Sequence, residues 1–309
     1  MLMRAVPIPK RFARCLLRCA ATFTFAAIAL MFLATAKPCH AQELAPELET
    51  LGLRTRAQIE LKRLYSRMNQ ADQRRLVGIY IAFDPNPNDP SAMAACDDDG
   101  DYVVAITEAM LRLMANVARA QSFDETNGSR RIDSYAQFVA RAQLPGQRLL
   151  PPPPGFFSAA KPAVTFEDRL REALAFVLAR EMAHMKAGDL VCPHPTATHE
   201  SGDDVWTDDE QRAALEGAKK IYPGNATERD AQATAALVNA DLTEEGALGL
   251  LRFFVQFEIE RVNFSSRFAP RYLAQHPNPV ARMATVRAAA QTARAVKDGS
   301  APSPGSTSL

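Results

Sequence analysis

The feature that most constrains the fold is a long apolar helix predicted between Thr165 and Gly188. Its large apolar residues recur three to four positions apart: Leu170, Leu174, Val177, Leu178 and Met182. Thr165 and Asp168 resemble a capping box in which Asp replaces the usual Glu, and Gly188 is a favourable residue for ending a helix. Polar residues in the later turns of the predicted helix include Arg180, Glu181 and His184.

Glu181 and His184 match part of a zinc-binding motif. In zinc hydrolases, His-Glu-x-x-His places two imidazoles at positions i and i+4 of a helix, where both reach one metal ion, and the Glu activates a metal-bound water. Here position 180 is Arg, so the general base and the second histidine are present but the first ligand is missing. By itself, a Glu and a His three positions apart indicate little, since such pairs are common in helices.

Residues 174–189 read Leu-Ala-Phe-Val-Leu-Ala-Arg-Glu-Met-Ala-His-Met-Lys-Ala-Gly-Asp. Apart from the Arg, this is similar to the active helix of the HtpX-like and CAAX-prenyl-protease type of zinc metallopeptidase, a gluzincin family. The resemblance extends over most of residues 75–290 through three further segments: Ser91–Cys96 with Tyr102–Thr107, Glu228-Arg-Asp230-Ala-Gln-Ala233, and His276-Pro-Asn-Pro-Val-Ala-Arg282.

The resemblance implies a zinc ion held by His184 and Glu228. Glu181 would then deprotonate a zinc-bound water that attacks a peptide carbonyl, which the metal also polarises. The expected activity is that of a metalloendopeptidase.

Three more residues receive roles from the resemblance. Asp230 would orient a ligating imidazole. His276 would stabilise the oxyanion or approach the metal, or alternatively would only cap and pack. Arg282 would hold the C-terminal segment in place.

Arg180 conflicts with this site, because a guanidinium has no lone pair for zinc and its positive charge repels the cation. One interpretation is a pseudopeptidase in which Arg180 occupies the metal position and pairs with a carboxylate of Glu181, Glu228 or Asp230. In a second, Arg180 turns away and zinc binds to His184, Glu228 and another donor, for which the candidates are His276, His194 and His199. In a third, Arg180 is a variant of a native histidine.

Two classes of function follow. The first is an exported zinc metalloendopeptidase that acts on envelope or misfolded proteins. The second is an inactive peptidase fold that binds polypeptides like a chaperone or inhibitor, with the strand near Val103 pairing with an extended chain. A helical exported protein with coincidental motif matches is the remaining alternative.

The N-terminus reads as a secretory signal. Basic residues precede an apolar run over residues 19–36, and cleavage before Gln42 would place Cys39 and Ala41 at positions −3 and −1. The alternative is an uncleaved anchor, which would be the only contact with a membrane. Either way we expect an exported protein of the periplasm or cell envelope.

Removing residues 1–41 changes the composition. The 309-residue chain has a net charge of +1 and five cysteines, but residues 1–41 hold six basic residues, no acid and three of the cysteines. The remainder has 30 basic and 35 acidic residues, a net charge of −5, so a nucleic-acid partner is not expected. Its two cysteines, Cys96 and Cys192, predict either a disulfide, as is usual in an oxidising compartment, or two buried thiols.

The fold class expected from these patterns is α+β, a mainly helical zincin-like domain with a small antiparallel sheet over residues 42–297. Strands are predicted at 77–83 and 101–106, joined as a hairpin or meander, and an insertion or lid at 121–164 contains one short helix near 135–142. Residues 298–309 should be a disordered tail. Further helices are predicted at 46–75, 107–120, 207–220, 225–239, 243–262 and 279–297.

Overall fold

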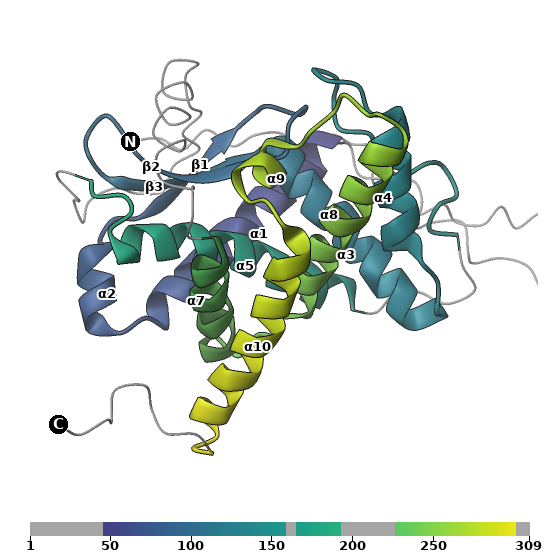
Figure 1. Ribbon diagram of the computed structural model, residues 1–309. Helices are drawn as coiled ribbons and strands as arrows, with labels where there is room; N and C mark the ends of the chain where they lie inside the picture. The colour runs from purple at the N-terminus through teal and green to yellow at the C-terminus, as the bar shows by residue number, and fades with distance from the viewer. Residues whose placement is uncertain (1–45, 159–164, 193–225, 301–309) are drawn as a thin grey trace, which may run out of the picture. The chain divides into compact units, whose positions relative to one another are not determined.

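The computed structural model describes residues 46–158, 165–192 and 226–300 (Figure 1). The described residues belong to one compact unit. The predicted signal segment, the predicted helix at 207–220, the candidate ligands His194 and His199, and the last nine residues of the predicted tail lie outside the described residues.

A three-stranded sheet forms from β1 (Tyr80–Asp84), β2 (Ala92–Cys96) and β3 (Tyr102–Thr107) in the order β1-β3-β2. β2 pairs with β3 antiparallel, but β1 pairs with β3 parallel, so the expected antiparallel sheet is in fact mixed. The reason is β2, which was not assigned as a strand in its own right. β2 lies between β1 and β3 in the sequence but at the far edge of the sheet in space. β3 is therefore the central strand, and it runs in the same direction as β1.

The predicted core helix is α5 (Phe166–Ala187), and Gly188 ends it with φ 80°, as expected for a glycine C-cap. The predicted capping bond of Thr165 is not made. Its hydroxyl lies 2.7 Å from the carboxylate of Glu125 instead, so tertiary contact replaces the local cap. All residues from Ala173 to Met185 on α5 are buried.

Helices surround α5 on several sides. It contacts α1 (Pro46–Ser66), α3 (Glu108–Asn127), α7 (Ala226–Asn239), α8 (Glu245–Asn263), and also β2 and β3. α10 (Pro279–Lys297) packs along α7 and α8, and Figure 1 shows α7 and α10 side by side below the sheet. α5 is therefore the central helix of the described fold.

The remaining helices refine the predicted boundaries. The expected helix at 46–75 is divided into α1 and α2 (Gln70–Arg75), and a short helix α9 (Arg271–Gln275), which was not predicted, precedes His276. α3 continues to Asn127, and α4 (Arg131–Ala142) packs on α3 and α8, so the predicted insertion is more helical than expected. Its role as a lid stays a prediction.

A disulfide joins Cys96, the last residue of β2, to Cys192, with the Cα atoms 5.5 Å apart. It links the edge of the sheet to the segment that follows α5. Of the helices within the described ranges, none combines the length and apolarity needed to span a membrane.

Candidate functional site

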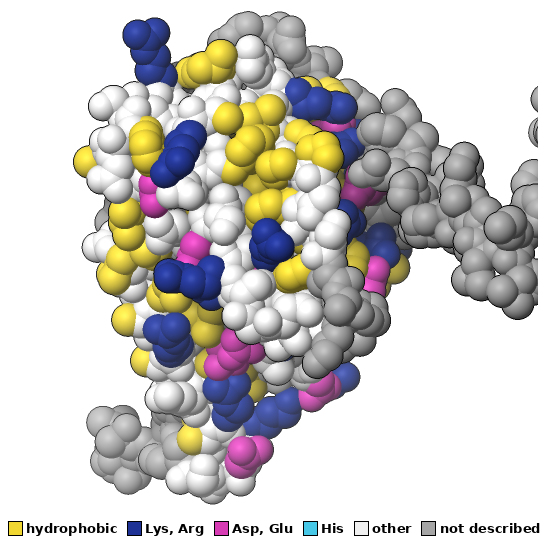
Figure 2. Space-filling model, turned by 90° about the vertical axis from the view of Figure 1, so that its right-hand side faces the viewer, with side chains coloured by type: hydrophobic (Ala, Val, Ile, Leu, Met, Phe, Trp, Pro, Cys, Tyr) yellow, Lys and Arg dark blue, Asp and Glu magenta, His cyan; other side chains and the backbone are white. Residues whose placement is uncertain are grey.

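Polar side chains from four helical segments meet in the interior beside α5. Arg180, Glu181 and His184 come from α5, Asp230 from α7, His276 from the end of α9, and Arg282 from α10; each residue is 0% exposed. No histidine of the described residues is visible on the face drawn in Figure 2, in keeping with rings that are fully buried. The structure thus brings together six of the seven described residues that the sequence singled out around a metal site.

The guanidinium of Arg180 lies at the centre of this cluster. Its Nη1 atom is 3.2 Å from Nε2 of His184, 3.1 Å from Nε2 of His276 and 3.4 Å from Oε1 of Glu181. A single donor nitrogen therefore faces both imidazoles and the glutamate.

Asp230 bridges two guanidiniums. Its Oδ1 accepts a hydrogen bond of 3.0 Å from Nε of Arg180, and Arg282 donates to both of its oxygens, at 2.7 Å from Nε and 3.0 Å from Nη2. The sequence analysis expected Asp230 to orient an imidazole, whereas the partners of its carboxylate in the structure are two arginines. With neutral imidazoles, two arginines balance Asp230 and Glu181, so the cluster carries no net charge.

His184 is oriented by Asp189, which the sequence analysis did not single out. The two are 2.8 Å apart, between Nδ1 and Oδ2, and Arg229 donates two hydrogen bonds to the same carboxylate at 2.7 and 2.9 Å. With its proton on Nδ1, His184 offers the Nε2 lone pair to Arg180. Burial, reinforced by the charge of Arg180, lowers the pKa of His184 to about 4, so the ring is neutral at pH 7.

The turn after α5 positions Asp189. The amide of Gly188 donates to Met185 O and that of Asp189 to His184 O, at 3.2 and 3.0 Å, which folds the chain back over the helix end. The hydrogen bonds from Arg229 then lower the pKa of Asp189. The Gly-Asp pair at the end of the helix motif was the available signal for this residue.

His276 is held by its own C-terminal neighbours. Asn278 adopts φ 58° and its side chain accepts a hydrogen bond from the amide of Ala281, which caps the start of α10. Because α10 begins directly after this turn, Arg282 in its first turns donates a hydrogen bond of 3.1 Å from Nη1 to the carbonyl of His276. Burial and the charges of Arg180 and Arg282 keep the pKa of His276 well below its ordinary value. Its imidazole is therefore neutral and accepts from Arg180.

Glu181 connects the cluster to the sheet. Its Oε2 accepts a hydrogen bond of 3.0 Å from the amide of Ala94 on β2, while Oε1 faces Arg180. Both carboxylate oxygens thus have a donor.

Glu228 does not join the site. Its side chain is 63% exposed and contacts Arg229 at 3.1 Å and Gln232 at 3.3 Å. Residues two positions apart on a helix point in nearly opposite directions, so when Asp230 faces the core, Glu228 faces outward. The structure does not bring Glu228 to Arg180 or to the imidazoles, and its role as a metal ligand stays a prediction.

The described residues do not fit a zinc ion as they stand. The point that His184, His276 and Glu181 share is filled by Arg180 Nη1, a donor with a positive charge. Over the described ranges no three His, Cys, Asp or Glu side chains are placed to hold a metal. What the arrangement provides is a neutral hydrogen-bonded cluster around a guanidinium.

Comparisons with known proteins find no family model that matches the chain and no match to a curated protein or a solved structure.

Proposed function

We propose that the protein is an inactive counterpart of a zinc metallopeptidase that binds polypeptides without cleaving them. The observation that carries the proposal is the position of Arg180 Nη1, within 3.4 Å of His184, His276 and Glu181. The guanidinium of Arg180 thereby supplies a positive charge among the groups for which the motif resemblance implies a metal ion.

Energetics support a permanent rather than an exchangeable cation. Arg180 is covalently attached, fully buried and paired with Asp230, whereas zinc would have to enter after this arginine had left. Breaking one partner out of a buried ion pair costs about 3–5 kcal/mol, because a charge remains uncompensated. Zinc would also place its charge beside that of Arg282.

The proposed surface for a polypeptide has to differ from the one expected from sequence. Val103 lies on β3, which is hydrogen-bonded to a strand on each side, so it has no edge to offer an extended chain. Pairing by β-strand addition requires β1 or β2. On β2, the amide of Ala94 already donates to Glu181.

The location and clients remain those expected from the sequence. An exported protein of the cell envelope meets unfolded or misfolded polypeptides there, and the leader over residues 1–41 is the reason for placing it in that compartment.

A second candidate, an active metalloendopeptidase, is favoured by one observation. Glu181 and two imidazoles converge on a single point, as a zinc site with a general base would need. It requires that Arg180 move away.

Zinc analysis separates the two. Full-length wild type, purified with zinc in the medium, should contain substoichiometric metal and should not cleave casein. Arg180→His removes the central positive charge and adds an imidazole one helical turn before His184, so this variant should bind zinc. The matched double variant Arg180→His with Glu181→Gln should bind zinc without cleavage. Stoichiometric zinc in the wild type, lost in His184→Ala, would overturn the pseudopeptidase proposal.

A further inference from the structure

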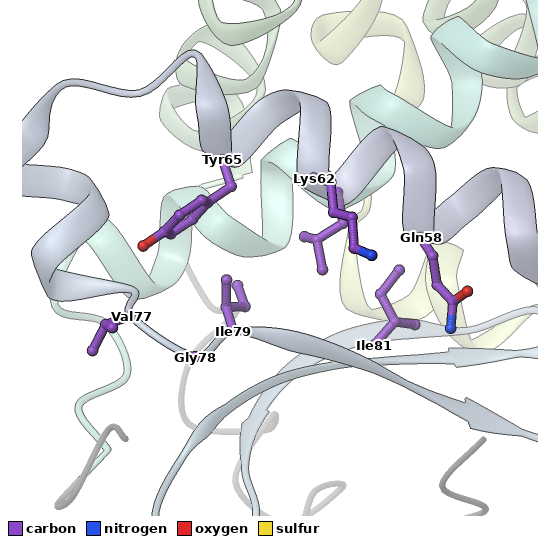
Figure 3. Close-up of a pocket in the computed structure, with 8 residues that line it drawn as sticks. Gln58, Lys62, Tyr65, Val77, Gly78, Ile79 and Ile81 are labelled. Atoms are coloured by element: carbon purple, nitrogen blue, oxygen red, sulfur yellow. The ribbon is translucent and has the colours of Figure 1, made fainter. Parts of the chain in front are cut away.

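A groove separates α1 from the segment that enters β1. It encloses about 260 Å³ and lies on the opposite edge of the sheet from β2 and Glu181. Figure 3 shows side chains of α1 pointing toward the strand below, with the groove between them. Small ligand pockets begin at roughly 300 Å³, so this volume suits a few side chains and not a large cofactor.

The walls of the groove are apolar. Leu61 and Tyr65 line it from α1, and Val77, Ile79 and Ile81 line it from the strand side. Val77 lies in the turn over residues 76–78, and Ile79 and Ile81 continue from it into β1, so the apolar row runs from a turn into a strand opposite a helix. Such a row can receive the apolar side chains of a bound polypeptide.

The rim on α1 is cationic. Positions 54, 58 and 62 are four residues apart and share one side of the helix, and they hold Arg54, Gln58 and Lys62. Arg54 lies over the ring of Phe83 on β1, 5.3 Å from its centroid. Within the described ranges neither Arg54 nor Lys62 forms an ion pair.

Main-chain groups are available at the mouth of the groove. Val77 and Gly78 lie between α2 and β1, and in the part of the chain that the structure describes their amides and carbonyls make no hydrogen bond. β1 follows directly and pairs, among described strands, with β3 alone. An extended chain laid here finds donors, acceptors, apolar walls and positive charge together.

We propose that this groove binds an extended polypeptide segment that carries apolar side chains next to an acidic residue. The main chain of the segment hydrogen-bonds to the amides and carbonyls of the turn at Val77 and Gly78, an apolar side chain enters between Tyr65 and Ile79, and the carboxylate meets Lys62. This inference rests on the proposed function, polypeptide binding without cleavage, and names the surface where the polypeptide binds.

The test uses full-length protein and three fluorescein-labelled decapeptides. The first alternates Val or Leu with Ser and contains two Glu, the second has Lys in place of Glu, and the third is the first with N-methyl groups on alternate residues. Fluorescence polarisation should give binding of the acidic peptide, weaker binding of the basic one by about tenfold, and a similar loss for the N-methylated one, which cannot pair.

Lys62→Glu should reverse the preference between acidic and basic peptides. The matched control is Arg287→Glu, an equal charge change at an exposed position of α10, which should leave both affinities unchanged. Equal binding of acidic and basic peptides by the wild type, or an equal effect of the control, would overturn the proposal. Undiminished binding of the N-methylated peptide would assign the groove to small carboxylate ligands and overturn it as well.

Zinc content measured on the same preparation keeps the two proposals apart. Stoichiometric zinc together with binding that depends on Lys62 would remove the pseudopeptidase proposal and retain the groove. If zinc is absent and no binding depends on Lys62, the proposal for the groove is overturned and the pseudopeptidase proposal is retained.

Discussion

Nε of Arg180 donates to Oδ1 of Asp230 over 3.0 Å, and both side chains are 0% exposed although 50 positions separate them in the chain. This ion pair joins α5 to α7 in the interior. Because Arg282 binds the same carboxylate, Asp230 compensates two buried positive charges.

Asp230→Asn should therefore lower the free energy of unfolding by about 3–5 kcal/mol, since it leaves buried arginines uncompensated. Urea unfolding followed by far-UV circular dichroism measures the loss. The control is Glu167→Gln in the exposed pair with Arg56, whose side chains are 43% and 62% exposed, and it should change stability by less than about 1 kcal/mol. Equal losses in the two variants would contradict the buried pairing.

His184 should make the protein less stable in mild acid. Its folded pKa of about 4 lies below the ordinary value of 6.5, so the unfolded chain binds the proton first as the pH falls. The stability from this group is present above pH 6.5 and is lost as the pH falls toward 4. Between pH 7.5 and 5 the loss should be about 2 kcal/mol.

Urea unfolding of wild type and His184→Gln at both pH values isolates this contribution, because carboxylates titrate alike in the two proteins. The drop should be smaller in the variant by about 2 kcal/mol. An identical drop would mean that His184 is not held neutral by burial and Arg180.

Glu228 provides a test of which residues form the site. Because its side chain is 63% exposed, Glu228→Ala should change stability by no more than about 0.5 kcal/mol. It should also leave zinc uptake by Arg180→His unaltered. In the same background, Asp189→Asn should weaken zinc binding by about 10 to 100-fold, because Asp189 orients His184. Isothermal titration with zinc compares the two, and the reverse ranking would restore Glu228 as a ligand.

The disulfide between Cys96 and Cys192 should contribute on the order of 4 kcal/mol, because it closes a loop of nearly 100 residues in the unfolded chain. Replacing both cysteines with serine should lower the denaturation midpoint by a corresponding amount. Peptide mapping without reductant should recover the linked pair, and two free thiols in the oxidised protein would show that the bond is absent.

Local patterns in the sequence identified the two helices α5 and α10. The apolar spacing between Leu170 and Met182 and the glycine at position 188 identified α5, and α10 begins at Pro279 and ends at Lys297 as its pattern predicted. These signals are read from residues a few positions apart, so they need no knowledge of the fold. The motif matches likewise selected Arg180, Glu181, His184, Asp230, His276 and Arg282, which the structure brings together.

Only the tertiary structure decided the direction in which the strands pair and the partners of the buried side chains. The parallel pairing of β1 with β3 depends on where β2 lies. The hydroxyl of Thr165 bonds to Glu125 and does not cap its own helix, because α3 brings Glu125 beside it. The choice between Asp230 and Glu228 follows from which side of α7 faces α5. The sequence alone left three interpretations of Arg180 open. Packing places its guanidinium among two imidazoles and two carboxylates, because a buried charge needs partners that only the assembled helices supply.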